Sequence, residues 1–314
     1  MRWIRACQRI LLRLWFRTGR KPGWHYRYVE ARGAGLAGRE PLVSRLPDGS
    51  RVECDLREQI PRLIYFQGVY EPPEAYLFTQ LVQPGWTVID CGANIGQYTL
   101  LAASRIGAGG AVHCFEPVPS TAAQLRRNLA ANGPTAVVRV NEAALWHEPA
   151  QLQLGLATAN EFVSGGFSVG VRAEREALAR QIEAPGIVFD AYAVSQRLER
   201  VDLIKMDIEG AEYFALQGMR ATLRRHRPLI QMEICRSYGE RLGYLPGDIW
   251  KLLVEEMGYQ AWAIGSAADE SHTLVSLEGI DQQNVIFHAK PLPAPVLRGW
   301  DRRSLLRWSR QGWR

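Results

Sequence analysis

Residues 84–117 read PGWTVIDCGANIGQYTLLAASRIGAGGAVHCFEP, and this stretch decides the fold. A Pro-Gly turn opens it, and residues 86–91 form a short, mostly apolar run that suits a strand buried on both faces. Gly92 and Gly96 follow, and a helix is expected over residues 98–105. Glycines between a strand and a helix let the backbone approach a ligand closely, and the first turn of the helix offers free N–H groups. The pattern predicts one side of a binding site.

The end of the same stretch supplies an acid. Residues 111–115 predict a neighbouring strand that ends on Glu116, twenty residues beyond Gly96. A carboxylate at that strand tip can accept both hydroxyls of a ribose. This order of elements, in which a strand, a glycine turn and a helix are followed by a second strand and an acid, therefore indicates a site for a nucleoside cofactor. The alternative is that the glycines only form a turn and that Glu116 is solvated.

The sign of the charge separates the possible cofactors. Dinucleotide sites usually show G-x-G-x-x-G, with the pyrophosphate at the helix N-terminus. This chain has two glycines instead, and an acid stands at the tip of the first strand. A carboxylate there repels a pyrophosphate and attracts the cationic end of S-adenosylmethionine. We expect that cofactor to be bound by Asp90, Gly92, Asn94, Gly96 and Glu116.

A later strand carries charges of both signs. In residues 202–208, DLIKMDI, Lys205 and Asp207 alternate with apolar residues, and Glu209 follows. Charges in a buried strand are costly unless they are paired or functional. A structural lysine–acid pair is one explanation. Acids at the carboxyl end of a strand, beside the predicted cofactor crevice, favour a functional one.

Two acids at other strand tips complete the candidates. Residues 137–141 predict a third strand, and Glu142 after it is placed to touch an adenine, with a surface turn as the alternative. Residues 228–234 predict a fifth strand, with Glu233 near its tip. We expect Glu233 to contact the substrate.

The charge of the chain is concentrated at its ends. Residues 1–40 hold nine arginines and one lysine against two glutamates, giving +8, and residues 296–314 hold six arginines against one aspartate, giving +5. Subtracting both from the net charge of +6 leaves −7 for the residues between them. An acidic body argues against a protein that clamps nucleic acid.

The composition is that of an ordinary globular protein. Of 314 residues, 47% are hydrophobic, which is enough for a sizeable core. Nothing reaches the run of about eighteen apolar residues that a membrane span needs. Five cysteines without a C-x-x-C pair indicate reduced thiols in a cytoplasmic protein, rather than disulfides or structural zinc.

Both basic ends are amphipathic. Residues 3–16 predict a helix with its apolar residues on one side and its arginines on the other, where Leu12 and Phe16 interrupt the polar face. Such a helix either lies on an anionic membrane surface or packs on its own domain or a partner. Residues 298–314, with tryptophans among arginines, have the same character. Our hypothesis is that this stretch and residues 1–17 form a peripheral contact with a membrane or an acidic partner.

The chain divides into four expected segments. Residues 1–40 form a basic N-terminal segment, mostly loop from residue 18 onwards, and residues 41–83 form a cap of one hairpin and one helix. Residues 84–290 form the cofactor-binding domain, and residues 291–314 form a basic, Trp-rich tail. Further predicted elements are a flap at 151–170, helices at 120–132, 174–181, 211–225 and 247–257, an extended piece at 187–190, and strands at 259–264 and 283–289.

On these residues the chain resembles the FkbM-type family of class I S-adenosylmethionine-dependent methyltransferases. The resemblance covers residues 66–289 and rests on GVYE at 68–71, VIDCGANIG at 88–96, FEP at 115–117, DLIKMDIEGAE at 202–212, and Glu233. It implies an α/β, Rossmann-like fold with a seven-stranded, mostly parallel sheet, an antiparallel last strand and helices on both faces. It also implies methylation of a hydroxyl, often on a sugar or a polyketide. The basic ends lie outside it.

Methyl transfer to a hydroxyl sets the roles of the acids. The acceptor oxygen has to be held about 3 Å from the methyl carbon, and a base has to take its proton. We assign Asp207 as the general base or acceptor-orienting residue, Lys205 as the group that holds its charge, and Glu209 and Glu233 as substrate contacts. No metal is required, but these three acids also offer the oxygen ligands that Mg²⁺ prefers, so that alternative stays open.

Two other functions stay as alternatives. An RNA methyltransferase fits the basic ends, but the body is acidic and lacks the Asn-Pro-Pro-aromatic string of base-amine methyltransferases. A catalytically idle binding protein that recruits partners through its ends would not need Asp90, Glu116 and Asp207 together. The expected acceptor is a small molecule or a glycan, one version of which is lipid-linked.

Overall fold

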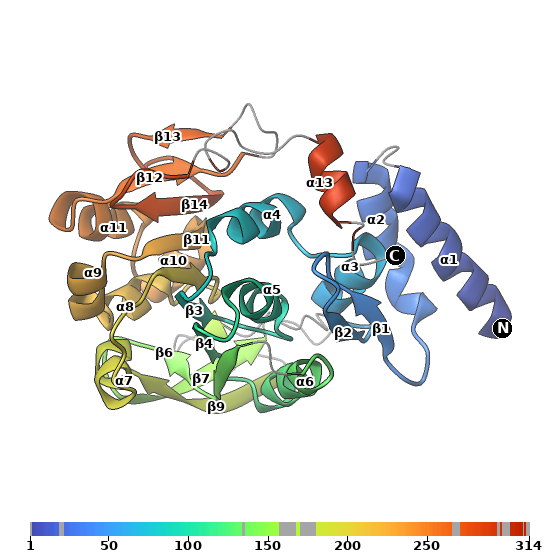
Figure 1. The fold of residues 1–314 in the computed structure, drawn as a ribbon, viewed down its shortest axis with the longest axis horizontal. Coiled ribbons are helices and arrows are strands. Elements are labelled where there is room, and N and C mark those ends of the chain that lie inside the picture. Colours follow the sequence, from blue (N-terminus) through green and yellow to red (C-terminus); the bar gives the residue numbers. More distant parts are fainter. Residues whose placement is uncertain are drawn as a thin grey trace.

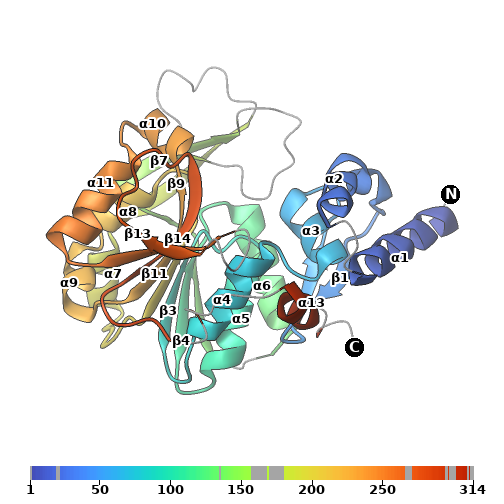
Figure 2. The ribbon, with the colours of Figure 1, turned by 90° about the horizontal axis from the view of Figure 1, so that it is seen from above.

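The computed structural model describes residues 2–18, 22–133, 136–156, 168–169, 180–265, 271–293, 296, 302–309 and 311. In this part of the chain a sheet of eight strands forms the centre, and helices cover both of its faces (Figures 1 and 2). The strand order is β13-β12-β14-β11-β10-β3-β4-β5, so the order reverses between β3 and β10. Open α/β sheets bind ligands outside the carboxyl ends of their strands at such a reversal.

Five strands of the sheet run parallel to one another. They are β3 (Thr87–Cys91), β4 (Ala111–Phe115), β5 (Val137–Asn141), β10 (Leu203–Met206) and β11 (Leu229–Cys235). The last strand, β14 (Gln282–His288), enters antiparallel between β11 and β12 (Gln260–Ala263). The predicted α/β sheet with an antiparallel last strand is confirmed.

The strand count differs from the predicted seven, because the described part of the sheet has an eighth strand at its edge. This strand, β13 (His272–Leu274), has three residues and pairs antiparallel with β12. A strand so short and so exposed carries no apolar alternation that could be recognised in the sequence.

Two sets of helices cover the sheet (Figure 2). One face is covered by α4 (Pro72–Leu81), α5 (Gln97–Ile106) and α6 (Pro119–Ala130). The other face is covered by α7 (Phe189–Ser195), α8 (Glu212–Gln217), α9 (Arg220–His226) and α11 (Pro246–Trp250), which continues as the π-helical η3 (Lys251–Glu256). Helix α10 (Arg236–Leu242) follows β11.

Alternation along β10 places the charges on one face. Ile204 and Met206 pack among the residues beneath α8 and α9, whereas Leu203 belongs to the core on the α5 side. Because side chains of a strand alternate, Lys205 points to the α5 side as well. It pairs in register with Asp90 of β3, which therefore lies on the same face.

The N-terminal part is more helical than predicted. Helix α1 (Arg2–Thr18) is confirmed, but the expected loop holds α2 (Pro22–Arg32) and the 3₁₀ turn η1 (Gly33–Leu36). The sequence of α2, PGWHYRYVEAR, has no apolar stripe at helical spacing, so periodicity could not reveal it. The buried Val29 and a hydrogen bond between His25 Nε2 and the Leu12 carbonyl hold α2 against its surroundings.

The rest of this part connects to the sheet. The predicted hairpin is present as β1 (Leu42–Arg45) and β2 (Arg51–Cys54), followed by α3 (Gln59–Gln67). At the other end of the chain, α13 (Arg302–Ser309) packs on α4, where the rings of Trp308 and Tyr76 lie 5.5 Å apart. None of the described helices is both long and apolar enough to cross a membrane.

Several predicted elements differ in the middle of the chain. A second sheet contains β6 (Ala144–Leu145), β7 (Ala150–Leu156), β8 (Ser168–Val169) and β9 (Arg180–Ile187). Most of the predicted flap at 151–170 and of the predicted helix at 174–181 lies outside the described residues, and residues 180–181 are strand. Of the expected extended piece at 187–190, residues 187 and 188 are extended, whereas residues 189 and 190 begin α7.

The predicted helix at 211–225 is two helices, α8 and α9, which are separated at Gly218 and Met219. A Cβ at Gly218 would lie 2.3 Å from the carbonyl oxygen of Trp146, so the close approach of that backbone requires a glycine there. The sequence offered no sign of this contact, because Trp146 is distant along the chain.

Candidate active site

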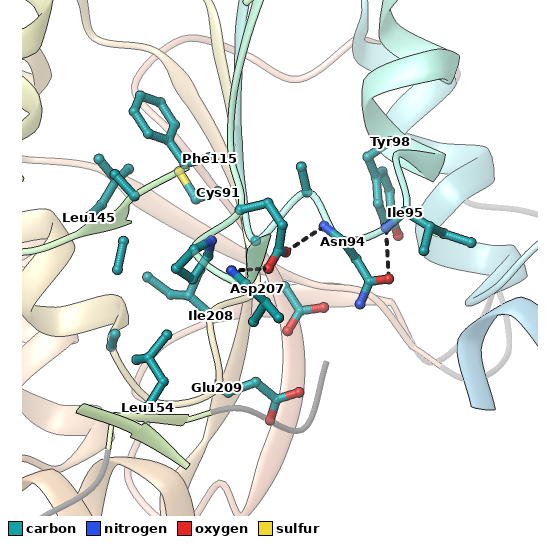
Figure 3. A pocket seen from close by; sticks show the side chains of 18 of the residues that line it. Cys91, Asn94, Ile95, Tyr98, Phe115, Leu145, Leu154, Asp207, Ile208 and Glu209 are labelled. Atoms are coloured by element: carbon teal, nitrogen blue, oxygen red, sulfur yellow. Dashed lines mark hydrogen bonds between the residues drawn. The ribbon is translucent and has the colours of Figure 1, made fainter. Parts of the chain in front are cut away.

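A cavity lies at the carboxyl ends of β3, β4 and β10, where the strand order reverses (Figure 3). It has about 980 Å³ of empty space, its open mouth included. Figure 3 shows apolar side chains, Phe115 and Leu145 among them, on the side opposite Asn94. The lining comes from the turn after β3, the tip of β4, residues 143–145, the segment after β10, and two residues of the N-terminal part, Ile60 and Tyr70.

Both glycines of the turn have positive φ values, and Gly92 also lies against the backbone of another segment. Gly92 has φ +77°, and a Cβ on it would lie 2.0 Å from the carbonyl oxygen of Asp207. Gly96 has φ +98°, and a Cβ there would meet Leu125 at 2.4 Å. The backbone after β3 therefore touches the backbone after β10, and any larger residue at position 92 would push these two sides of the cavity apart.

Glu116 is fixed at the edge of the cavity by the backbone. Its two carboxylate oxygens accept hydrogen bonds from the N–H groups of Asn94 and Val118, each at 2.9 Å. Burial raises the pKa of Glu116 to about 7, while the two hydrogen bonds act in the opposite direction. The acid predicted for a ribose thus lies on the cavity and is held in one orientation.

Asp90 is a correction to the sequence prediction, because it does not line this cavity. Its side chain is buried and accepts a hydrogen bond from Thr99 Oγ1 of α5 at 2.6 Å. Burial raises its pKa to about 6. The cavity begins one residue later, at Cys91, whose side chain points to the opposite face of β3. Asp90 and Glu116 therefore do not face one crevice, although both lie near the ends of neighbouring strands.

Glu142 is a second correction. It does not line the cavity; it forms a salt bridge with Arg126 of α6, and its side chain is 41% exposed. The next residues, Ala143 to Leu145, line the cavity instead. The third strand tip therefore contributes apolar side chains rather than a carboxylate.

A buried lysine forms the centre of the second half of the site. Lys205 is 1% exposed, and its Nζ lies 3.5 Å from Asp207 Oδ2 and 4.8 Å from the centre of the Tyr98 ring. Within the described part of the structure, this ammonium has no hydrogen-bond partner. Burial alone would lower the pKa of Lys205, but the charges of nearby acids, Asp207 first among them, raise it above its usual value.

Three further carboxylates, those of Glu71, Glu209 and Glu233, lie around the pair of Lys205 and Asp207. Burial, with the charge of Asp207 acting in the same direction, raises the pKa of Glu71 to about 8, of Glu209 to about 9 and of Glu233 to about 7. Asp207 and Glu209 line the cavity, whereas Glu233 lies next to it and accepts a hydrogen bond from Gln282 at 2.7 Å. The sequence placed Asp207, Glu209 and Glu233 here.

Glu71 is the acid whose role the sequence did not reveal. It accepts a hydrogen bond from the Tyr98 hydroxyl at 3.3 Å. The side-chain amide of Gln97 binds both the N–H and the carbonyl of Tyr70, at 2.7 and 2.9 Å, and so fixes the chain just before Glu71. The position of Glu71 in the GVYE motif was the available signal in the sequence. The sequence around this motif does not indicate, however, that it lies next to Lys205 in the fold.

Backbone strain gathers around the cavity. Glu71, Asn94 and Glu209 have φ values of 47°, 51° and 55°, in the left-handed region that residues other than glycine rarely adopt. Such conformations persist only where the surrounding structure enforces them, and they are frequent at functional sites. Among the described residues, no group of three or more acidic, histidine or cysteine residues is arranged to hold a metal ion.

The comparison with known families agrees with this arrangement. Residues 90–261, more than half of the chain, match the family described as Methyltransferase FkbM domain. The chain belongs to the FkbM methyltransferase family. The FkbM match includes Glu116, Lys205, Asp207, Glu209 and Glu233, and it begins after Glu71.

Two curated FkbM relatives share part of the chain. Methyltransferase sdnD of Sordaria araneosa is 28% identical over 161 residues, which are 42% of this chain and 60% of that protein. Methyltransferase 1 of Beauveria bassiana (strain ARSEF 2860) is 27% identical over 169 residues, which are 49% of this chain and 66% of that protein. The chain thus spans less than two thirds of the length of either relative.

Solved structures align more distantly. A Methyltransferase FkbM from Methylobacillus flagellatus KT aligns with a TM-score of 0.37 and 16% identity, covering 74% of this chain and 56% of that one. An O-methyltransferase from Bacillus cereus in complex with SAH aligns with a TM-score of 0.41 and 14% identity, covering 71% and 83%. At such scores the fold assignment rests on the strand order of the sheet itself.

Proposed function

We propose that this protein is an S-adenosylmethionine-dependent methyltransferase that methylates a hydroxyl of a sugar, a glycan or a similar polyhydroxylated molecule. The observation that carries the proposal is one cavity with a backbone-anchored carboxylate, Glu116, at one end and the Lys205–Asp207 pair beside Glu209 at the other. The family assignment supports the same reaction class.

The first end of the cavity fits a nucleoside. A carboxylate has about four acceptor positions, and the N–H groups of Asn94 and Val118 use two at Glu116, so two are left for the vicinal hydroxyls of a ribose. Phe115 and Leu145 supply apolar surface for a flat base. These residues would hold S-adenosylmethionine, which supplies an electrophilic methyl group when bound.

The charge of the cavity lining favours S-adenosylmethionine over a dinucleotide. The residues that carry this charge differ from those that the sequence indicated. Asp90 is hydrogen-bonded to Thr99 and does not supply the negative charge that faces the cofactor. The carboxylates that line the cavity are Glu116, Asp207 and Glu209, and Lys205 is not part of the lining. Because the raised pKa of Glu209 keeps that acid largely protonated near neutral pH, the negative charge of the lining comes from Asp207 and from the ionised form of Glu116; it attracts a sulfonium and an ammonium group and repels a pyrophosphate.

The second end of the cavity supports activation of an alcohol. Asp207 is paired with Lys205 and borders the cavity, so we assign it as the general base that accepts the proton of the acceptor hydroxyl. The raised pKa of Glu209 keeps this acid largely protonated near neutral pH, so it can donate a hydrogen bond to a further hydroxyl of a polyol; the pKa of Glu71 is raised as well, but Glu71 does not line the cavity. Glu233 stands next to this group.

Two experiments test the proposal. Calorimetry with S-adenosylmethionine should give one binding site on the wild-type protein, and weaker binding for Glu116→Gln. Incubation with radiolabelled cofactor and cell extract, fractionated into lipid, glycan, RNA and small molecules, should place the label in a hydroxyl-bearing fraction. Binding without label in any fraction would favour an idle binding protein, and label in RNA would favour the RNA methyltransferase instead.

A further inference from the structure

Helix α1 turns its apolar side away from the protein. Five of its large apolar residues are 47 to 84% exposed: Trp3, Ile4, Ile10, Leu11 and Leu14. On a 3.6-residue helix these positions lie on one side, so they form a continuous apolar strip. The helix lies at the outer edge of the molecule, away from the central sheet (Figures 1 and 2).

The opposite, arginine-bearing side of α1 packs on the protein. Arg9 Nη1 donates to the carbonyl of Leu36 at 3.0 Å, and the Arg13 guanidinium lies 4.8 Å from the centre of the Tyr65 ring of α3. Leu12 and Phe16, the two residues that interrupt this polar side, are buried. They explain why the helix is attached by the side that the sequence marks as polar.

The apolar strip continues on α2. Trp15 of α1 contacts Tyr28 of α2, with ring centroids 6.4 Å apart. Tyr28 and Trp24 are four residues apart and both exposed, so they lie on one side of α2. We name the exposed apolar residues of both helices the N-terminal apolar face: Trp3, Ile4, Ile10, Leu11, Leu14, Trp24 and Tyr28.

We infer that the N-terminal apolar face inserts into the surface of an anionic membrane. Soluble proteins rarely expose a contiguous strip of large apolar side chains without a binding role. Arg9 and Arg13 face the protein, but the segment of residues 1–40 as a whole carries a charge of +8, so its net field attracts the molecule to acidic lipid headgroups. Tryptophan and tyrosine among leucine and isoleucine suit the boundary between headgroups and acyl chains.

The surface and the cavity share one structural element. Helix α3 packs on α1 and on α2, and its residue Ile60 lines the cavity. Gln59 of α3 donates to Glu30 of α2 at 2.8 Å. The proposed membrane contact is therefore next to the N-terminal wall of the cavity. Helix α13 is not part of this face, because its Leu305 is buried and its Trp308 packs against Tyr76 of α4.

Sedimentation of the full-length protein with vesicles tests the inference without any activity measurement. Wild-type protein should sediment with vesicles of phosphatidylcholine mixed with phosphatidylglycerol, less with phosphatidylcholine alone, and less at high salt. Leu11→Asp should weaken binding to the anionic vesicles about tenfold or more. The matched control is Val275→Asp, because Val275 is also exposed but lies after β13; it should change binding by less than about twofold.

Two results would overturn the inference. One is a wild-type protein that does not bind anionic vesicles, or that loses binding equally with both substitutions. The other is a wild-type dimer in lipid-free sedimentation velocity that Leu11→Asp converts to a monomer, since the face would then join two copies of the chain. Thermal unfolding of both variants should match that of the wild type, because both positions are exposed.

Discussion

The two ends of the cavity differ in the chemical groups that surround them. At the β3–β4 end, backbone N–H groups and apolar side chains surround one carboxylate, Glu116. At the β10–β11 end, acidic side chains crowd around Lys205, and burial and mutual repulsion raise the pKa values of three of them. The first end has fixed geometry and a defined hydrogen-bonding pattern, as binding requires. The second end has titratable groups, as proton transfer requires.

The comparison also shows how position along a strand decides the use of a carboxylate. Asp90 and Glu116 end neighbouring strands, but Asp90 is still part of β3, and its side chain points between the sheet and α5. Glu116 is one residue beyond β4 and bends toward the loop above the sheet. A shift of two positions along the sheet register, from inside the strand to just beyond its end, thus separates an acid that holds a helix from an acid that lines the cavity.

The sharpest test of the division is Asp207→Asn. Asparagine keeps the shape of the side chain but cannot take the proton of the acceptor, so kcat should fall about 10²- to 10⁴-fold. The affinity for S-adenosylmethionine, measured by calorimetry, should change only a few-fold, because the nucleoside is held at the other end. Loss of cofactor binding with normal turnover of the bound complex would show that the two ends have been assigned the wrong way round.

Gly92→Ala tests the point where the two ends touch. The new Cβ would be 2.0 Å from the Asp207 carbonyl oxygen, a backbone atom that cannot move aside without shifting the loop after β10. We expect a loss of about 3 kcal/mol or more in the free energy of unfolding, measured in urea, and a loss of both binding and turnover.

The matched control for this substitution is Gly107→Ala. Gly107 also has a positive φ, +64°, but nothing lies within 4 Å of the added Cβ. Only the conformational cost of about 1–3 kcal/mol applies there, with binding and turnover unchanged. Equal effects of both substitutions would mean that backbone conformation alone, rather than the contact with Asp207, makes Gly92 necessary.

Local sequence signals predicted the backbone elements of the first end of the cavity, but not which of its acids face the cavity. The strand, the glycine turn, the helix and Glu116 lie within one continuous stretch, and the apolar run and the glycines each have a local cause. The face to which Asp90 points depends on where the strand ends, which composition does not reveal. Glu71 joins Lys205 from 134 positions earlier in the chain, and only the folded structure brings them together.

The N-terminal helices show a different limit. Periodicity predicted the two sides of α1, but it cannot tell which side the protein covers. Tertiary contacts decide this: Leu12 and Phe16 are buried, and Arg9 and Arg13 contact the protein. The helix α2 was missed altogether because its stability comes from packing rather than from a sequence pattern.

Glu116→Gln tests the binding end with a smaller expected effect. A neutral amide accepts hydrogen bonds more weakly than a carboxylate and has a single acceptor oxygen, so the affinity for S-adenosylmethionine should fall about 10- to 100-fold. Turnover at saturating cofactor should change much less. Glu142→Gln is the matched control, because Glu142 pairs with Arg126 outside the cavity; a comparable loss there would return Glu142 to the cofactor site.

A further test is the pH dependence of stability, which reports on the acids around Lys205. The carboxyl groups of Glu233, Glu71 and Glu209 have pKa values raised from 4.5 to about 7, 8 and 9. Between the unfolded and folded pKa values the native state binds more protons than the unfolded state, so stability falls as the pH rises. The contribution is fully present below pH 4.5 and is lost as the pH passes through the folded values, so the melting temperature should decrease from about pH 5 to about pH 9.

Replacing one of these acids separates this effect from other titrations. Glu209→Gln removes the group with the highest of the three pKa values, so the melting temperature of this variant should depend less on pH toward the alkaline side of that window. Glu142→Gln should keep the wild-type slope, since Glu142 is exposed and lies away from the acids around Lys205. If instead both variants keep the wild-type slope, Glu209 does not hold its proton in the folded state and is not the hydrogen-bond donor at the acceptor end of the cavity.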